Sequence, residues 1–148
     1  MRMTLHTDYA LRMLIYVAAR RDRVCTVNDV AKAYGLSRNH LLKVAQTLRD
    51  LGLVETTRGR AGGVRLAKPP AEIAIGALVR ATEEDFSLAE CMQANGRACA
   101  ISPACRLKGM LHEALAAFLT VLDKYTLADI IQNKAALGSL LHIDVQAA

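Results

Sequence analysis

The chain has 148 residues, of which 53% are hydrophobic and 22% are charged. This composition is typical of one ordinary globular domain and excludes an intrinsically disordered chain. No run of about 18 uncharged apolar residues occurs, so a membrane-spanning helix is not expected. The apolar stretch at 10–19 follows Asp8, contains Arg12 and lacks a small-residue cleavage site after it. We therefore expect no secretory signal and a cytoplasmic protein.

Charge is unevenly distributed along the sequence. Residues 1–70 contain 13 Lys and Arg against 5 Asp and Glu, a net of +8, whereas residues 71–148 contain 6 against 9, a net of −3. A basic half suits a polyanionic partner, because each neutralised phosphate releases counterions. The pattern favours a nucleic-acid partner as much as it favours a merely solvated basic surface.

The first expected element is a helix over 7–20, with Thr7 and Asp8 at its start. Its apolar residues share one face, as in a helix that packs into a core. They are Leu11, Leu14, Ile15 and Ala18.

Two short helices joined by a glycine turn come next. Thr26 and Asp29 have the spacing of a capping box, so one helix is expected from there to about Tyr34, where Gly35 ends it. Ser37 is expected to cap the second helix, which ends at Gly52. Its apolar residues at helical spacing are Leu41, Val44, Ala45, Leu48 and Leu51. This arrangement predicts a helix-turn-helix, with an ordinary helical hairpin as the alternative.

The exposed N-terminal end of the second helix is expected to contact DNA, since recognition helices touch base edges there. Arg38, Asn39 and His40 are the candidates for reading bases, and Lys43 is a candidate for a phosphate contact. A solvated polar helix face is the alternative interpretation.

A basic hairpin follows directly, with strands at 53–57 and 64–66 around a glycine-rich tip. Arg58, Arg60 and Arg65 would contact phosphates or the minor groove. The segment therefore predicts a wing and a mainly α, winged helix-turn-helix fold over residues 1–82. A core helix over 73–82 completes this DNA-binding domain, with Ile73, Ala77, Leu78 and Ala81 on its apolar side.

Three clustered cysteines lie in the next segment, residues 83–106: Cys91, Cys99 and Cys105. Gly96 and Pro103 disfavour a continuous helix there, so a loop is expected to hold the thiols. Three thiols cannot all pair, and their spacing differs from the paired hooks of structural zinc. An iron-sulfur cluster suits such a loop, while free cysteines and zinc remain alternatives. Cys25 stands apart and is interpreted as a small apolar filler.

The last part, residues 107–148, is expected to form a dimerisation helix and a tail. The helix runs from Leu107 to Tyr125 and carries two adjoining apolar stripes, one of which is available for a twin helix. Burial of both stripes within one subunit is the alternative. The first stripe is Leu107, Leu111, Ala114, Phe118, Val121 and Tyr125; the second is Leu115, Leu119 and Leu122. A short helix at 127–133 and a loosely held tail would follow.

Several segments together carry a family resemblance: residues 7–12, 34–40 and 58–66, the three cysteines, and residues 101–130. They resemble the bacterial iron-sulfur winged-helix repressors of the NsrR type, over nearly the whole chain. The resemblance implies a homodimeric repressor that binds double-stranded DNA operators and releases them when nitric oxide reacts with its cluster. The cluster is expected to be 4Fe-4S, with 2Fe-2S as the alternative.

The resemblance also implies a ligand set. Cys91, Cys99 and Cys105 would bind the cluster, and Asp8 of the partner subunit, near Arg12, would be the fourth ligand. Without the resemblance, Asp8 is explained by its favourable position at a helix N-terminus. The related IscR regulators have a histidine where this chain has Lys108, whereas RirA regulators share the cysteine spacing, which keeps an iron-responsive role open.

The clustered cysteines leave other classes of function open. An iron-sulfur carrier or a thiol oxidoreductase would also use clustered cysteines, but neither would need the basic helix and wing. No Cys-x-x-Cys pair is present, so an enzyme is not expected.

The thiol loop between Ser87 and Cys105 has few apolar residues, and we expect it to become mobile when the cluster is lost.

Overall fold

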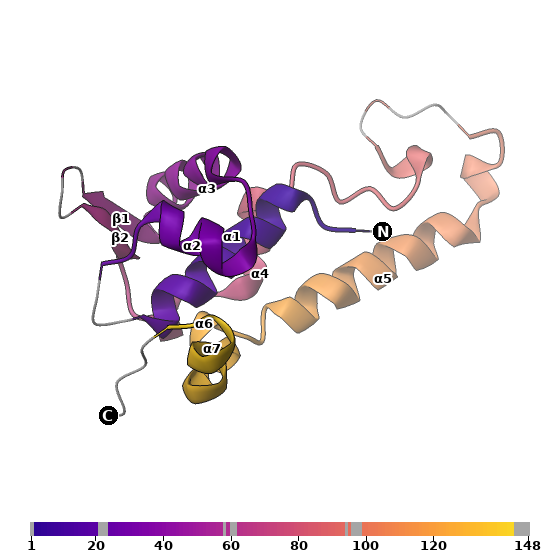
Figure 1. Ribbon diagram of the computed structural model, residues 1–148. Coiled ribbons are helices and arrows are strands. Elements are labelled where there is room, and N and C mark those ends of the chain that lie inside the picture. Colours follow the sequence, from indigo (N-terminus) through magenta and orange to yellow (C-terminus); the bar gives the residue numbers. More distant parts are fainter. Residues whose placement is uncertain are drawn as a thin grey trace.

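The computed structural model describes residues 2–20, 24–57, 59, 62–93, 95 and 99–143 (Figure 1). Seven helices and one antiparallel hairpin occur within these ranges, and they confirm the predicted mainly helical, winged fold. The helices are α1 (Leu5–Ala19), α2 (Val27–Tyr34), α3 (Arg38–Asp50), α4 (Ile75–Thr82), α5 (Arg106–Leu122), α6 (Leu127–Ile130) and α7 (Lys134–Leu140). The strands are β1 (Val54–Thr57) and β2 (Gly63–Leu66), and short 3₁₀ turns lie at Pro70–Glu72, Glu90–Met92 and Ser102–Ala104.

Helix α1 is the centre of the core. It begins at Leu5, two residues earlier than predicted, because the Thr4 side chain accepts a hydrogen bond from the Thr7 backbone N–H. Met13 and Leu14 are fully buried, and α1 packs against α3, β2 and α4. This central position puts α1 in contact with both the helix-turn-helix and wing and the C-terminal part of the chain.

The helix-turn-helix forms for the local reasons that the sequence indicates. Thr26 and Asp29 make a reciprocal capping box at the start of α2, and Gly35 ends the helix with a φ of 64°. Ser37 precedes α3 as expected, but its hydroxyl makes no capping hydrogen bond. The predicted apolar face is buried from Leu41 to Leu48, whereas Leu51 ends the helix with 38% of its surface exposed.

The wing pairs Val54 with Leu66 and Thr57 with Gly63. Cys25 adds a bridge to its second strand, since the backbone groups of Cys25 and Val64 exchange two hydrogen bonds of 3.2 and 2.6 Å. The hairpin is thus anchored to the segment before α2 as well as to α3.

Helix α4 starts at Ile75 rather than at the predicted Ile73. The Ile73 carbonyl accepts from the Leu127 N–H, and the Ile75 N–H donates to the Tyr125 carbonyl, so this segment pairs with the chain beyond α5 instead of coiling. The shift also changes the buried face. Ile75, Leu78, Val79 and Thr82 are buried, whereas the predicted Ala77 and Ala81 are exposed.

Helix α5 extends away from the rest of the molecule (Figure 1). None of its residues is buried, and Leu107, Met110 and Val121 are 59%, 64% and 49% exposed. The following segment returns to the core through Leu127 and Ile131. Residues 134–143 are not the loose tail that was predicted, because α7 forms and Ile143 is buried beside it. Within the described ranges, no helix is both long and apolar enough to cross a membrane.

Candidate nucleic-acid interface and cysteine segment

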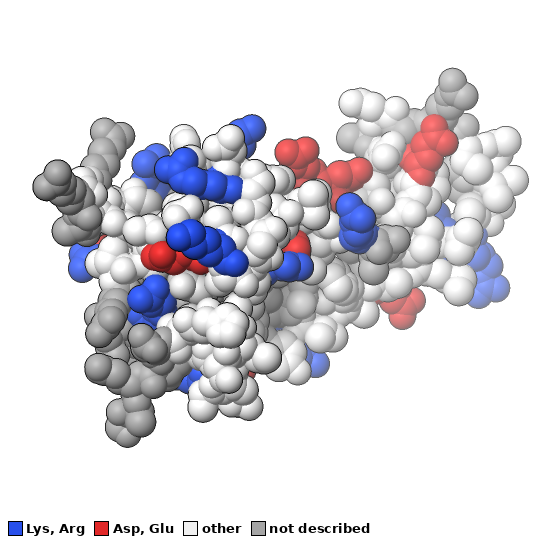
Figure 2. All heavy atoms as spheres, viewed as in Figure 1, with Lys and Arg blue, Asp and Glu red and all other residues white. Residues whose placement is uncertain are grey.

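The exposed side of α3 borders a groove. Arg38, Asn39 and Lys43 are all exposed. A cavity of about 430 Å³ lies between α3, the start of α2 and the hairpin, and Arg38, Gln46 and Thr56 are among its lining residues. Most of the Lys and Arg atoms visible in Figure 2 lie over the part formed by α1, α2, α3 and the hairpin. This side of the molecule therefore presents positive charge next to a surface helix and a wing.

His40 lies differently from its neighbours. It is half-buried and meets Tyr9 of α1 edge-on, with ring centroids 4.9 Å apart. His6 is also close, at 6.5 Å between ring centroids, and its Nε2 lies 3.1 Å from the Thr47 hydroxyl. The structure thus brings Arg38, Asn39 and Lys43 to the exposed side of α3 but turns His40 toward α1. Sequence periodicity gave no sign of this contact, since it joins residues far apart in the chain.

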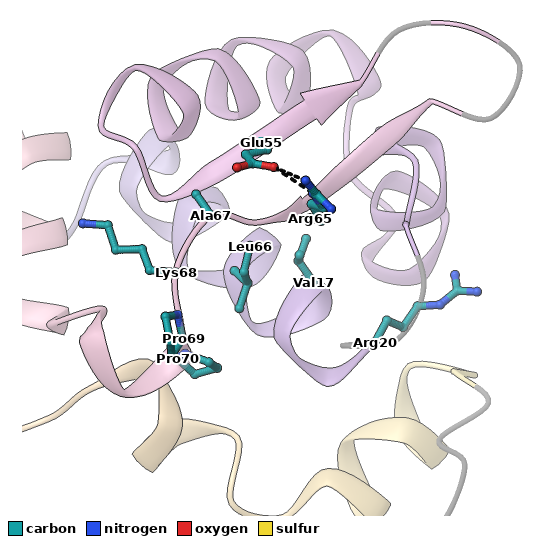
Figure 3. A pocket seen from close by; sticks show the side chains of 9 residues that line it. All are labelled: Val17, Arg20, Glu55, Arg65, Leu66, Ala67, Lys68, Pro69 and Pro70. Carbon is teal, nitrogen blue, oxygen red and sulfur yellow. Dashed lines mark hydrogen bonds and ion pairs between the residues drawn. The ribbon is translucent and has the colours of Figure 1, made fainter.

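Among the wing arginines, Arg65 is exposed and paired with Glu55 across the hairpin, with Nε 2.8 Å from Oε2. Arg58 and Arg60 lie outside the described residues. The Glu55–Arg65 pair borders a hollow of about 420 Å³ at the base of the wing (Figure 3). Arg20 and Lys68 point away from each other on its two sides, so its cations do not converge on one point.

Asp8 lies in the first turn of α1. Its two carboxylate oxygens accept from the Arg12 guanidinium at 3.0 and 2.8 Å, and that guanidinium lies 5.8 Å from the centre of the Tyr34 ring. Burial raises the pKa of Tyr34, with Arg12 acting in the opposite direction. The helix start is also tied to the beginning of the cysteine segment, because the Thr4 N–H donates to the Glu83 carboxylate at 2.8 Å.

The three clustered cysteines are free thiols outside the α-helices and strands, with Cys91 in the short 3₁₀ turn Glu90–Met92. Cys91 is half-buried, Cys99 is exposed, and Cys105 is half-buried directly before α5. The structure does not bring the predicted ligands together: among the residues it describes, no three His, Cys, Asp or Glu side chains are grouped so as to hold a metal ion. Only short 3₁₀ turns occur between Cys91 and Cys105, so no regular element in the described part of this segment fixes the sulfur positions.

This donor set is chemically suited to an iron-sulfur cluster. Thiolates are the ligands that such clusters use, and accessible thiols in a loop can adjust their positions to a bound group. Cys25 offers a contrast. It is fully buried, its Sγ lies 3.4 Å from the Val64 carbonyl, and burial raises its pKa to about 11. Cys25 therefore packs in the core, as the small apolar filler that the sequence indicates.

Comparison with known proteins agrees with this architecture. The family model described as Rrf2, iron-dependent transcriptional regulator, matches residues 3–133. The chain is 53% identical over 142 residues to the HTH-type transcriptional regulator NsrR of Geobacillus kaustophilus, covering 95% of this chain and 97% of that protein. It is 51% identical to the NsrR of Bacillus subtilis, with the same coverage of both chains.

A solved structure shares the fold. The global cysteine regulator CymR of B. subtilis superposes with a TM-score of 0.71 at 26% identity, covering 89% of this chain and 97% of that one. The named relatives are transcriptional regulators and not enzymes, which agrees with the expectation from the sequence. The chain therefore belongs to the Rrf2 family as a DNA-binding transcriptional regulator that resembles the NsrR proteins over nearly its whole length.

Proposed function

We propose that the chain is a homodimeric, iron-sulfur-cluster-dependent repressor that leaves its operators when nitric oxide attacks the cluster. One observation carries the proposal: three free thiols lie in an irregular segment between the DNA-binding part and the exposed helix α5, in a chain similar to NsrR regulators. Because its partner is DNA, the proposed site of action is the cytoplasm.

The proposed ligands are Cys91, Cys99 and Cys105 of one subunit and Asp8 of the partner subunit. A carboxylate binds a soft iron less tightly than a thiolate does, so it is the ligand most easily displaced. The bound cluster, 4Fe-4S in preference to 2Fe-2S, would supply the iron with which nitric oxide reacts. Arg12 pairs with both oxygens of Asp8 within its own chain, so this ion pair would have to open when the carboxylate binds the cluster.

Dimerisation is proposed to occur through α5. Burial of apolar surface drives most association between subunits, and α5 has no buried residue in the single chain. A two-fold dimer would place its two α3 helices one DNA turn apart, as two half-sites of an operator require.

The proposed DNA contacts follow the winged-helix geometry. Arg38, Asn39 and His40 would read base edges, and Lys43, Arg58, Arg60 and Arg65 would contact phosphates or the minor groove. Release would follow from a change in how α1 and α3 are held, because the start of α1 carries Asp8 and also packs on α3 through Tyr9.

A second candidate is an iron-responsive regulator with the same ligands. The separation of the three cysteines by seven and five residues favours it. An iron-sulfur carrier is a candidate of another class, although the exposed basic side of α3 has no use in a carrier.

The proposal is tested by purifying the full-length protein without oxygen and recording its absorption spectrum together with iron and sulfide contents. Nitric oxide is then titrated while binding to a duplex selected from a random library is followed. We expect a coloured protein that loses its cluster band and its DNA affinity together. Loss of DNA affinity on iron chelation alone would favour the iron-responsive regulator. A colourless protein that contains zinc would overturn the proposal of an iron-sulfur cluster.

The role of Asp8 is tested by comparing Asp8→Ala with Arg12→Met. Both variants lose the ion pair, but only the first loses the carboxylate. We expect Asp8→Ala to change the cluster spectrum and the nitric oxide response, and Arg12→Met to retain both. An unchanged cluster and response in Asp8→Ala would exclude Asp8 as a ligand.

A further inference from the structure

Helices α4 and α5 meet at an ion pair that lies directly against a glycine of α4. Arg80, in the last turn of α4, donates from both terminal guanidinium nitrogens to the two carboxylate oxygens of Asp123, at 2.5 and 2.7 Å. Asp123 is the residue that ends α5. The pair therefore joins the end of the exposed helix to the DNA-binding part of the chain.

Gly76 makes room for this ion pair. It lies one helical turn before Arg80, on the same face of α4. A Cβ atom added at Gly76 would overlap the Asp123 Oδ1 and lie 2.9 Å from the Arg80 Nη1. An alanine at this position would force the Asp123 carboxylate, and the Arg80 guanidinium with it, to move away from the helix.

Helix stability alone does not account for this arrangement. A carboxylate at a helix C-terminus faces the negative end of the helix dipole, which is unfavourable. Both side chains are more than 40% exposed, and exposed ion pairs contribute little to folding stability. A bidentate guanidinium–carboxylate pair does, however, restrict the relative orientation of the groups that it joins.

Backbone hydrogen bonds reinforce the contact of Gly76 and Arg80 with Asp123, which we call the α4–α5 joint. The Ile75 N–H donates to the Tyr125 carbonyl at 3.0 Å, and the Leu127 N–H donates to the Ile73 carbonyl at 2.9 Å. These bonds hold the residues on either side of Gly76 and Asp123 in register. No residue of α5 is buried, and Leu115 and Phe118 in its middle border a hollow shared with Val79 of α4, so contacts at its C-terminal end contribute to its direction.

We propose that Gly76, Arg80 and Asp123 fix the angle of α5 to the DNA-binding domain and thereby select the spacing between operator half-sites. The inference rests on the proposed homodimer. In a dimer joined through α5, a tilt of this helix changes the separation of the two α3 helices, and half-site spacing follows that separation. The three residues are thus positioning residues that touch no base.

The experiment measures binding to a set of duplexes that carry the two half-sites selected by the unaltered protein, with base pairs added or removed between them. We expect Gly76→Ala and Arg80→Met to reduce the preference for the native spacing about fivefold or more. Binding to a single half-site and the dimer dissociation constant, measured by sedimentation, should stay unchanged. Because the two changes disturb one contact, the double variant should resemble the single variants.

Two matched controls accompany these variants. Gly109→Ala makes the same replacement in α5, where an added Cβ would meet nothing within 4 Å. Lys124→Met removes a positive charge from the residue next to Asp123. Both controls should keep the native spacing preference.

The outcomes separate the inference from the proposed function. If the protein is a dimer and its Gly76→Ala and Arg80→Met variants retain the native spacing profile, the α4–α5 joint does not select the spacing. The repressor proposal would then stay intact. A monomeric unaltered protein, or one without paired half-sites, would overturn the dimer proposal and this inference with it.

Discussion

The His40 ring of α3 lies edge-on against the Tyr9 ring of α1, with 4.9 Å between their centroids. Tyr9 follows Asp8 directly, so one turn of α1 carries both the proposed cluster ligand and a contact to the helix that is expected to read DNA. The contact gives a physical route by which a change at the start of α1 reaches α3.

This contact predicts different effects for two substitutions of Tyr9. Tyr9→Ala should destabilise the protein by about 2 kcal/mol, since an aromatic contact and half-buried area are lost. Tyr9→Phe keeps the ring and should cost less than about 0.5 kcal/mol. Urea denaturation of both variants checks this, and equal stabilities would show that the ring contact contributes nothing.

The same contact makes the role of His40 testable. If His40 reads a base as proposed, His40→Ala changes the sequence preference at one position of each half-site. If its ring serves only to position α3, selection from a random duplex library returns the unaltered consensus with weaker binding. Arg38→Ala is the comparison, and it should relax the preference at one base pair by about 1–3 kcal/mol.

Gly63 in the wing should not tolerate a larger residue. An added Cβ would overlap the Val24 side chain and lie 2.6 Å from the Cys25 carbonyl oxygen, which accepts the Val64 N–H. We expect Gly63→Ala to lower the free energy of unfolding by about 1–3 kcal/mol. Gly109→Ala, in open space on a helix, should instead be neutral or stabilising by up to about 1 kcal/mol. Thermal denaturation distinguishes the two, and a Gly63→Ala protein of unaltered stability would contradict the close packing.

Cys25 should make stability fall at high pH. Burial raises the pKa of its thiol from 9.0 to about 11, so the folded state keeps its proton longer than the unfolded state does. The resulting stabilisation is complete below about pH 9 and declines by about 1.4 kcal/mol per pH unit up to about pH 11. The difference in unfolding free energy between the unaltered protein and Cys25→Ala isolates this effect from other titrating groups. If this difference in unfolding free energy stays constant from about pH 8 to about pH 11, the raised pKa is contradicted.

The salt dependence of DNA binding should distinguish the Lys and Arg side chains that contact phosphates from those that do not. Lys43→Ala and Arg60→Ala are expected to weaken binding to all duplexes and to reduce the slope of log K against log salt by about 0.9 for each lost phosphate contact. Lys134→Ala, on α7, is the matched control and should change neither quantity. An Arg60→Ala protein with unaltered affinity and slope would remove the wing from the interface.

The cysteine segment should gain protection when the cluster is bound. Residues 87–105 contain only short 3₁₀ turns and no buried hydrophobic residue among those described, so few contacts of their own hold them. We expect slower amide hydrogen exchange there in the cluster-loaded protein than in the cluster-free one. Peptides from α1 and α4 provide the internal reference, and equal exchange in both states would contradict cluster-dependent ordering.

The sequence by itself determined the elements whose causes are local. The capping box of Thr26 and Asp29, the turn at Gly35 and the apolar spacing from Leu41 to Leu48 all act within a few residues, so the helix-turn-helix and the wing were predictable. The three clustered cysteines were visible for the same reason, because their proximity in sequence needs no fold.

Tertiary structure decided the features that depend on distant partners. Ile73 pairs with Leu127 instead of starting α4, His40 turns toward Tyr9, and residues 134–143 fold back onto the core. The close contact at Gly76 likewise appears only when Asp123 lies against it. Periodicity in the sequence shows which face of a helix or strand is apolar. It carries no information about the distant residues that this face, or a polar side chain beside it, will contact.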